Sequence, residues 1–395
     1  MQQVLYFLIF MSVSVLIYWL LPWRKRSIFL VGASLVFMCF LSPKYAVYLF
    51  FNSLLIYIAG SYVSRDEKNR KLFLQLSLFW LIGNLCIFKY INFMLDALSR
   101  LGISLPFMNE TTFSKIIMPL GMSYVIFRLI HYIVEIYRKT LPEHTFWDLA
   151  LYTFFFPTFL AGPVDRFQKV QPQTAGCKSF DSSDFNYGLF RMISGMIKKF
   201  VVADSIKKYI MPLLLSPQDV SPLLVTLSVY GLAIQIYMDF SGYTDMALGV
   251  SRLFGYKIVE NFNNPYLKKN IALFWRNWHM SVYSFIRDYF FFPFFGYRAS
   301  QAKIYIGIFS TMVIFMLWHE GSLPFLLLGV YHGSGLLIWQ FFQEIKKKHA
   351  KIRKLVDNPY AVPFSTFITF TFVSFGYILF AFDMSTVKAI VYQII

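Results

Sequence analysis

The sequence is poor in charged residues, which fill only 14% of its 395 positions, against about 25% in an average soluble domain. Acidic residues are the rarer kind, with 20 Asp and Glu against 37 Lys and Arg. Hydrophobic residues make up 57% of the chain and aromatic residues 20%. Such a chain has too few charged side chains to cover its apolar surface in water. The composition excludes a soluble globular, disordered or coiled-coil protein and predicts a single integral membrane domain over residues 1–395.

Cysteine is also scarce, with three residues, Cys39, Cys86 and Cys177. They form no Cys-x-x-Cys pair and lack the spacing of metal ligands. Cys39 and Cys86 lie in apolar runs, where we expect them to be buried as small hydrophobic residues. The sequence therefore predicts no disulfide scaffold, no metal site and no redox site.

Long apolar runs predict an all-α polytopic membrane protein. The first run, at 4–21, has no basic segment before it and no small-residue cleavage site, so we expect a retained span and not a signal peptide. Two regions, 147–163 and 241–295, are broken by Pro, Gly and charge, which favours re-entrant or interfacial helices. In addition to these two broken regions we expect about 11 spans, each long enough for a hydrocarbon core of about 30 Å. The other runs lie at about 27–42, 45–63, 72–93, 116–137, 185–203, 221–240, 303–318, 322–343 and 361–382.

Four basic clusters, at 24–26, 65–71, 138–139 and 346–354, predict the orientation. The first, third and fifth expected spans end at the first three clusters, so one orientation places all three in the cytoplasm. The positive-inside rule then places the N-terminus outside, together with the loop at 96–114. The cluster at 346–354 is expected to be a cytoplasmic loop that meets lipid headgroups. Basic cytoplasmic loops also explain the net charge of +17. This explanation is simpler than binding of nucleic acid.

Ionisable residues within apolar segments are functional candidates because their burial is unfavourable. Asp165 and Arg166 directly follow a helix break at Pro157 to Pro163, although an interfacial turn would explain them equally well. Asp239 and Asp245 are six residues apart and would not share one face of a regular helix. We therefore expect Ser241-Gly242 to break the helix and let both carboxylates line a polar cavity. Helix capping by Ser241 or Asp245 is an open alternative.

Two clusters contain histidine. Residues 274–281, followed by Arg287, predict an amphipathic helix at the membrane interface, because Trp and Tyr lie beside Arg. His319 ends an apolar run, and a neutral imidazole there fits a general base better than a metal ligand. It is not part of a zinc-protease motif, because position 323 is Leu where that motif has a second His. Each histidine, His332 included, is alternatively a hydrogen-bonded core residue.

Taken together, the motifs resemble those of the membrane-bound O-acyltransferase (MBOAT) family, in the bacterial branch that contains alginate O-acetylase and the teichoic-acid D-alanyl transfer protein. They recur in the family's order and spacing over about 115–340. The residues that carry the resemblance are Pro157 with Gly162 to Phe167, Asp239 to Ala247, Asn261 to Tyr266, Phe274 to Ser281, Trp318-His319 and Tyr331-His332-Gly333.

The resemblance implies a ring of transmembrane helices around a thinned centre, where funnels from both membrane faces meet at a histidine. The family's catalytic histidine corresponds to His319 and its second functional histidine to His279. The residue after the catalytic histidine is usually Gly in this branch and is Glu320 here, where it would line the acceptor funnel or pair with an Arg. The remaining candidates for binding substrate or lining the cavity are Trp275, Arg276, Asn277, Trp278, Asp239, Ser241, Asp245, Asp165, Arg166, Arg287 and Trp318.

The implied function is transfer of an acyl group, with acetyl favoured, from a cytoplasmic thioester to hydroxyl groups of a cell-surface polysaccharide. D-alanyl transfer to teichoic acid or a similar polymer is the alternative within the family, and a transporter or lipid-binding scaffold is the alternative of another class. The implied location is the bacterial cytoplasmic membrane. The implied acyl donor is an acyl carrier protein or acyl-CoA, and no bound cofactor is implied. Whether a second acyltransferase on the outer face of the membrane is a partner is left open.

Overall fold

The computed structural model describes residues 2–101, 118–175, 179–296, 298, 300–356 and 358–395. Within these ranges the chain forms helices and no strand. The structure divides into two compact units, Met1–Gly195 with Tyr243–Val259 (unit 1) and Met196–Gly242 with Glu260–Ile395 (unit 2). Cys177 and most of the loop expected at 96–114 lie outside the described residues, and the helix before that loop extends to Arg100. The all-α prediction is confirmed.

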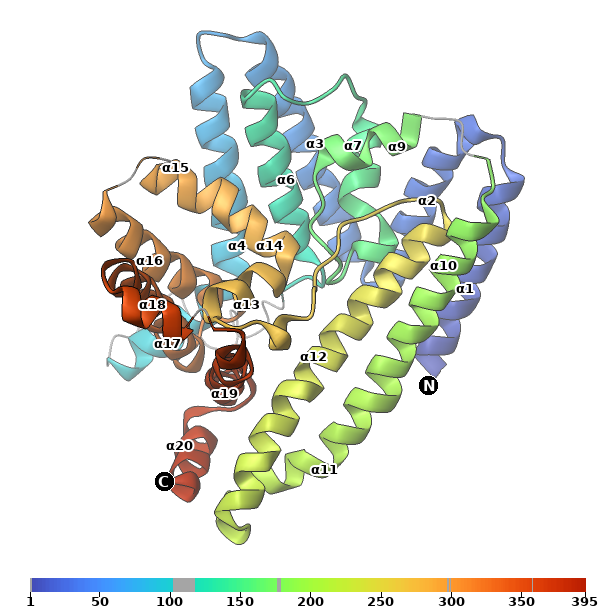
Figure 1. The fold of residues 1–395 in the computed structure, drawn as a ribbon. Coiled ribbons are helices and arrows are strands. Elements are labelled where there is room, and N and C mark those ends of the chain that lie inside the picture. The colour runs from blue at the N-terminus through green and yellow to red at the C-terminus, as the bar shows by residue number, and fades with distance from the viewer. Residues whose placement is uncertain (1, 102–117, 176–178, 297, 299, 357) are drawn as a thin grey trace. The chain divides into compact units, whose positions relative to one another are not determined.

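Unit 1 contains the N-terminal helices, coloured blue to green in Figure 1. Helices α3, α4 and α6 pack against one another, and α2 packs against α7. The helices that begin in this unit are α1 (Gln2–Leu20), α2 (Trp23–Leu41), α3 (Pro43–Arg65), α4 (Arg70–Arg100), α6 (Met122–Tyr137), α7 (Phe146–Phe154), the 3-10 turn η1 (Phe156–Thr158), α8 (Phe167–Val170), α9 (Pro172–Ala175) and α10 (Ser182–Met196).

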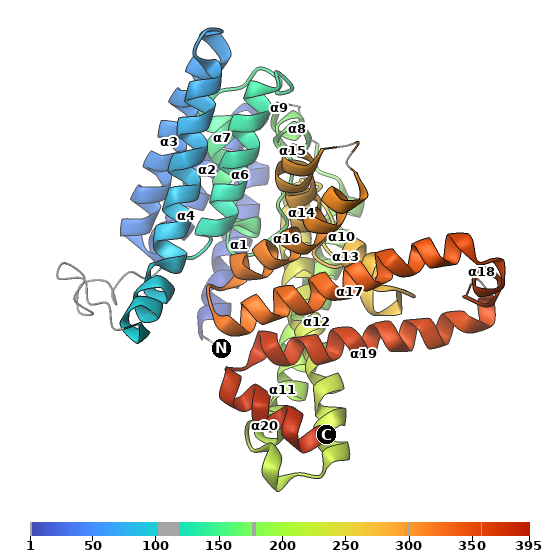
Figure 2. The same cartoon turned by 90° about the vertical axis from the view of Figure 1, so that its left-hand side faces the viewer.

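Unit 2 is built around α16 and α17, with α19 beside α17 (Figure 2). Gly329 lets α17 approach α16 closely, because a Cβ at this position would lie 2.7 Å from the Cα atom of Val313. Small residues allow such contacts between membrane helices. The elements that begin here are η2 (Ile197–Ala203), α11 (Asp204–Leu215), η3 (Pro217–Asp219), α12 (Pro222–Leu253), η4 (Pro265–Leu267), α13 (Ile271–Asn277), α14 (Met280–Ile286), η5 (Arg287–Phe291), α15 (Phe292–Phe295), α16 (Gln301–His319), α17 (Leu323–Lys348), α18 (Ala350–Val356), η6 (Pro359–Ala361), α19 (Val362–Ala381) and α20 (Met384–Ile394).

Six helical segments in the described part of the chain are long and apolar enough to cross a membrane. This confirms a membrane protein, while the total of about 11 spans stays a prediction. The six segments are Pro43–Arg65, Arg70–Ile91, Pro222–Leu253, Gln301–His319, Leu323–Lys348 and Pro359–Ala381, and Leu5–Leu20 is a shorter apolar helix.

Two sequence-based expectations about α12 and the cysteines are wrong. Helix α12 continues without a break through Ser241-Gly242, both of which are buried, so residues 241–253 are helix and not re-entrant chain. Glycine is tolerated inside membrane helices where neighbouring helices supply packing. Cys39 and Cys86 are exposed and not buried, since they lie on helix faces that this chain does not cover and that lipid would contact.

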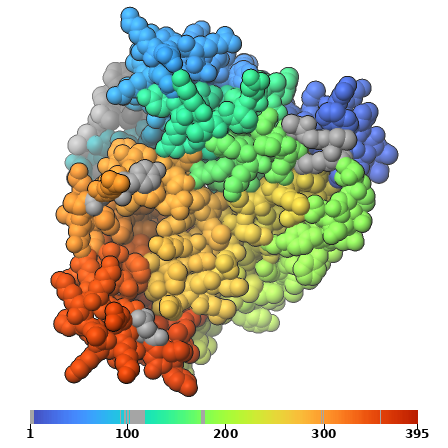
Figure 3. Space-filling model, turned by 45° about the horizontal axis from the view of Figure 1, so that its top comes forward, coloured from blue at the N-terminus to red at the C-terminus, as the bar shows by residue number. Residues whose placement is uncertain are grey.

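The basic segment 346–354 is a surface feature of unit 2. It comprises the last turn of α17 and most of α18, and most of its side chains are exposed. This part of the chain is red-orange in Figure 3, where it forms an exposed surface. Its lysines and arginine are therefore accessible to a negatively charged partner.

Candidate active site

The central feature of the site is a sharp turn between α13 and α14. Asn270 caps the start of α13, where its Oδ1 accepts a hydrogen bond from the Leu273 N–H at 2.8 Å. Helix α13 ends at Asn277, Trp278 is extended, and His279 has a φ of 49° in the left-handed region. Non-glycine residues are uncommon there because the side chain crowds the backbone. The single interfacial helix predicted for residues 274–281 is thus wrong, since the chain turns at His279.

Asn261 holds this turn in place. Its side chain is fully buried, and its Oδ1 accepts a hydrogen bond from the Ser281 N–H at 3.2 Å. Its carbonyl accepts from the Met280 N–H at 2.9 Å, and the Asn263 N–H donates to the Asn277 carbonyl at 3.1 Å. The segment 261–263, which the sequence marked only as part of a family motif, therefore satisfies backbone groups on both sides of His279.

We expect Asn261→Ala to lower the free energy of unfolding by about 1–3 kcal/mol, because the buried Ser281 N–H loses its acceptor. Thermal unfolding of the purified protein in detergent measures this effect. Asn263→Ala is the matched control, since Asn263 is exposed and contributes its backbone N–H, which alanine keeps. Equal unfolding temperatures for the two variants would contradict this role of Asn261.

The imidazole of His279 is buried at 1% exposure. The Phe240 ring lies edge-to-face against it, with 4.8 Å between ring centroids. Burial, reinforced by the positive charge that His319 can carry, holds the pKa of His279 well below its ordinary value. The ring is therefore neutral, with one N–H donor and one acceptor nitrogen.

Neither ring nitrogen of His279 has a hydrogen-bond partner among the described residues. Leaving a buried polar group unpaired is unfavourable by about 1–3 kcal/mol. His279 combines this unfavourable free energy with a left-handed backbone conformation. Strained residues with unpaired polar groups are typical of functional sites, where a substrate or a water molecule supplies the missing hydrogen bonds.

His319 is the last residue of α16 and is half-buried. Its ring lies 4.7 Å from that of Trp318 and 5.1 Å from that of Phe315, centroid to centroid. The Trp318 ring also lies 6.5 Å from the His279 ring. Unit 2 therefore brings His279 and His319 into one aromatic cluster, although 40 positions separate them in the sequence.

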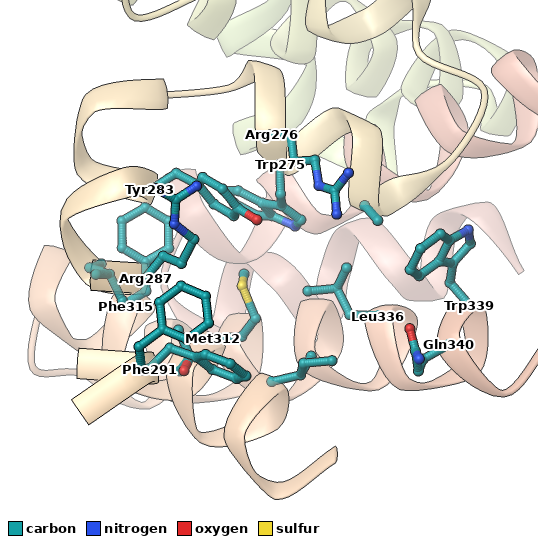
Figure 4. A pocket seen from close by; sticks show the side chains of 15 residues that line it. Trp275, Arg276, Tyr283, Arg287, Phe291, Met312, Phe315, Leu336, Trp339 and Gln340 are labelled. Carbon is teal, nitrogen blue, oxygen red and sulfur yellow. The ribbon is translucent and has the colours of Figure 1, made fainter. Parts of the chain in front are cut away.

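A cavity of about 300 Å³ lies in unit 2 beside this cluster. Trp275, Arg276 and Arg287 line it, as the sequence suggested for a substrate-binding surface, and Gln340 adds a further polar group (Figure 4). Most of the other lining side chains are apolar, including Phe315 and Met312. The cavity thus offers an apolar interior with two cationic side chains.

The remaining candidates in unit 2 do not line this cavity. Asp239 pairs with Lys199, with 2.6 Å between Oδ1 and Nζ. Asn277 donates from Nδ2 to the Leu273 carbonyl within α13. Ser241 is buried inside α12 and caps no helix, so capping is excluded. Trp278 is buried against Phe262 and Tyr266, whereas Glu320 is exposed just beyond α16.

Three candidates belong to unit 1. The Asp165 carboxylate is buried and accepts hydrogen bonds from the backbone N–H groups of Arg166 and Val259. Asp245 pairs with Arg191, with 2.5 Å between Oδ1 and Nη2, and does not cap a helix because α12 continues to Leu253. These contacts are structural, and a substrate role for Asp165, Arg166 and Asp245 stays a prediction.

The sequence analysis missed Asn261, Phe240 and Phe315 as site residues. Asn261 and Phe240 lie within motifs that carry the family resemblance but were assigned no role there. Phe315 cannot be distinguished by pattern from the other apolar residues of α16. No three His, Cys, Asp or Glu side chains in the described part of the chain gather as a metal site requires.

Comparison with known proteins gives several relatives whose names describe acyl-group transfer. A Pseudomonas aeruginosa protein named probable alginate O-acetylase is 29% identical over 376 residues, covering 94% of this chain and 70% of its own. The teichoic acid D-alanyltransferase of Bacillus subtilis is 31% identical over 275 residues, covering 66% of this chain and 68% of its own. The peptidoglycan O-acetyltransferase of Helicobacter pylori is 27% identical, covering 95% of this chain and 76% of its own.

The chain spans about two thirds of the length of the alginate O-acetylases that it matches. The sequence model of the membrane-bound O-acyltransferase family matches residues 135–379, which is more than half of the chain and includes both His279 and His319. This protein therefore belongs to the MBOAT family of acyltransferase enzymes.

Proposed function

We propose that this protein transfers an acyl group, with acetyl favoured, from a cytoplasmic thioester to hydroxyl groups of a cell-surface polysaccharide. The observation that carries the proposal is that His319 and a second histidine, His279, lie in one aromatic cluster. His279 is buried, neutral and without a hydrogen-bond partner among the described residues. Most buried side-chain polar atoms in protein cores are hydrogen-bonded, and here both ring nitrogens of His279 lack a partner among the described residues.

His319 is the proposed general base. Its unprotonated nitrogen takes the proton of the acceptor hydroxyl while the hydroxyl oxygen attacks the thioester carbonyl. The new C–O bond forms, the tetrahedral intermediate collapses, and the C–S bond breaks. The imidazolium of His319 then returns the proton to the leaving thiolate, so the enzyme ends in its starting state.

The oxyanion of the intermediate needs hydrogen-bond donors in a dry site. The N–H of neutral His279 is such a donor, because no described protein group uses it. Arg276 adds positive charge from the neighbouring helix α13, whereas the Asn277 amide is already bonded within that helix. His279 is therefore the proposed partner of the oxyanion, while Arg276 orients the donor from the cavity wall.

The donor is proposed to enter through the cavity lined by Arg276 and Arg287. Donor thioesters of CoA and of acyl carrier proteins share phosphopantetheine, whose phosphate suits arginine and whose chain suits an apolar wall. The exposed basic segment 346–354 would attract an acidic carrier protein or CoA. A cytoplasmic-membrane location with the N-terminus outside, and a ring of helices open to both faces, are parts of the same proposal and rest on the family resemblance and the basic clusters.

The acceptor and the acyl group are tested together on cells. In a strain of the source organism that lacks this gene, ester-linked acetate released from surface polymers by mild alkali should fall, and the gene on a plasmid should restore it. A loss of ester-linked D-alanine instead would support the alternative, D-alanyl transfer. Unchanged amounts of both esters, with solute uptake by liposomes that contain the protein, would contradict acyl transfer and support a transporter.

A further inference from the structure

The cavity ends at an aromatic layer that separates it from the catalytic histidine proposed above. Phe315 and Trp275 both line the cavity, with exposures of only 4% and 5%, and their rings pack edge-to-face at 5.6 Å. Phe315 also contacts the His319 ring at 5.1 Å and stacks on Trp318 at 6.0 Å. The Phe315 ring thus borders the cavity on one side and contacts the His319 ring on the other.

The cavity itself would not restrict the donor to a short acyl group. Its volume of about 300 Å³ is much larger than an acetyl group requires, since a cavity of about 150 Å³ can hold benzene. Its walls include Met312, Leu336 and Phe291, so a longer hydrocarbon chain would also be accepted (Figure 4). A restriction on the length of the acyl chain would therefore arise between the cavity and His319, where Phe315 lies.

Trp275, which packs against Phe315, offers a hydrogen-bond donor to a ligand in the cavity. The Trp275 indole N–H is buried and has no acceptor in the part of the chain that the structure describes. A carbonyl oxygen in the cavity next to Phe315 would satisfy it. This favours a bound acyl thioester over a purely hydrocarbon ligand.

We propose that Phe315 is a specificity-determining residue that limits the length of the transferred acyl group. The inference rests on the proposed function, in which the thioester enters through this cavity. An acyl group that enters with its methyl end leading must pass the Phe315 ring before its carbonyl carbon reaches His319. A short rotation of one ring admits an acetyl group, whereas a longer chain needs room that Trp275 and Trp318 occupy.

The test compares acetyl and butyryl thioesters of phosphopantetheine, the fragment common to both donor classes, with purified protein in lipid nanodiscs. Release of the free thiol is measured in the presence of polysaccharide acceptor. Phe315→Ala should raise the ratio of butyryl to acetyl turnover at least about tenfold, because two methylene groups in a tight pocket discriminate by that factor or more. Phe315→Leu should give an intermediate ratio and guards against misfolding of the alanine variant.

Phe291→Ala is the matched control, since Phe291 lines the same cavity but packs on Phe292 and Phe295. It should leave the ratio unchanged. An unchanged ratio in both Phe315 variants, an equal rise in Phe291→Ala, or loss of all turnover in folded Phe315→Leu would overturn the role of Phe315. Turnover that is the same in wild type and His319→Ala would instead contradict the proposed function.

Discussion

His319→Ala is expected to lower acyl transfer by at least about a hundredfold, because a positioned general base contributes about 10²–10⁴ to the rate. The loss should appear in kcat, since the imidazole acts on the proton of the attacking hydroxyl and makes no contact that binding of the donor requires. The measurement is thiol release from the donor thioester by purified protein, together with ester-linked acyl groups on the polymer of complemented cells.

The matched control for this change is His349→Ala. His349 is exposed after the end of α17 and belongs to the basic segment, so its loss should leave kcat unchanged. Size-exclusion chromatography must show that His319→Ala is folded. A folded His319→Ala protein with wild-type kcat would remove His319 from the mechanism and leave His279 as the remaining candidate for the base.

Arg128→Met is expected to destabilise unit 1 by at least about 3 kcal/mol, because hydrogen bonds to a buried charged group contribute about 1.5–3 kcal/mol each. Arg128 lies in α6 at 2% exposure. Its guanidinium donates to the carbonyls of Tyr152 and Thr153 at the end of α7, and to the Thr158 carbonyl and hydroxyl. The Tyr152 and Thr153 carbonyls lie in the last turn of α7, where carbonyls lack partners within the helix.

Methionine keeps the length of the arginine side chain but supplies no donor, so the carbonyls would be left buried and unpaired. A loss of this size is a large part of a typical folding free energy of about 5–15 kcal/mol. We therefore expect little monodisperse protein on size-exclusion chromatography and a lower unfolding temperature. Arg65→Met, at an exposed position in α3, should behave like wild type, and wild-type recovery of Arg128→Met would show that the carbonyls find other donors.

The α12 region shows where reasoning from local pattern fails. Ser241-Gly242 is an ordinary helix-breaking signal, yet the helix continues because both residues are buried by packing. The partners of the two α12 carboxylates, Lys199 for Asp239 and Arg191 for Asp245, lie 40 and 54 positions away. Nothing within one helical turn of either aspartate indicates these pairs.

The turn at His279 is a second case, in which a motif identifies the residue but the tertiary structure decides its conformation. The residues around the histidine predicted an interfacial helix, because Trp and Tyr lie beside Arg. The helix instead ends at Asn277, since Asn261 offers hydrogen bonds to the backbone after His279. The histidine was recognised by resemblance, but its strained and unpartnered state depends on a segment 18 positions earlier.

The amino-acid sequence alone determined that this is an all-helical membrane protein of the MBOAT type, with His279 and His319 as candidate site residues. Composition, apolar run length and ordered motifs are local properties, so they can be read without coordinates. Only the tertiary structure decided that the two histidines share one aromatic cluster, that Asn261 holds the turn between α13 and α14, and that Phe315 lines the cavity while contacting His319. Those features depend on contacts between segments far apart in the chain, which packing selects and local pattern does not encode.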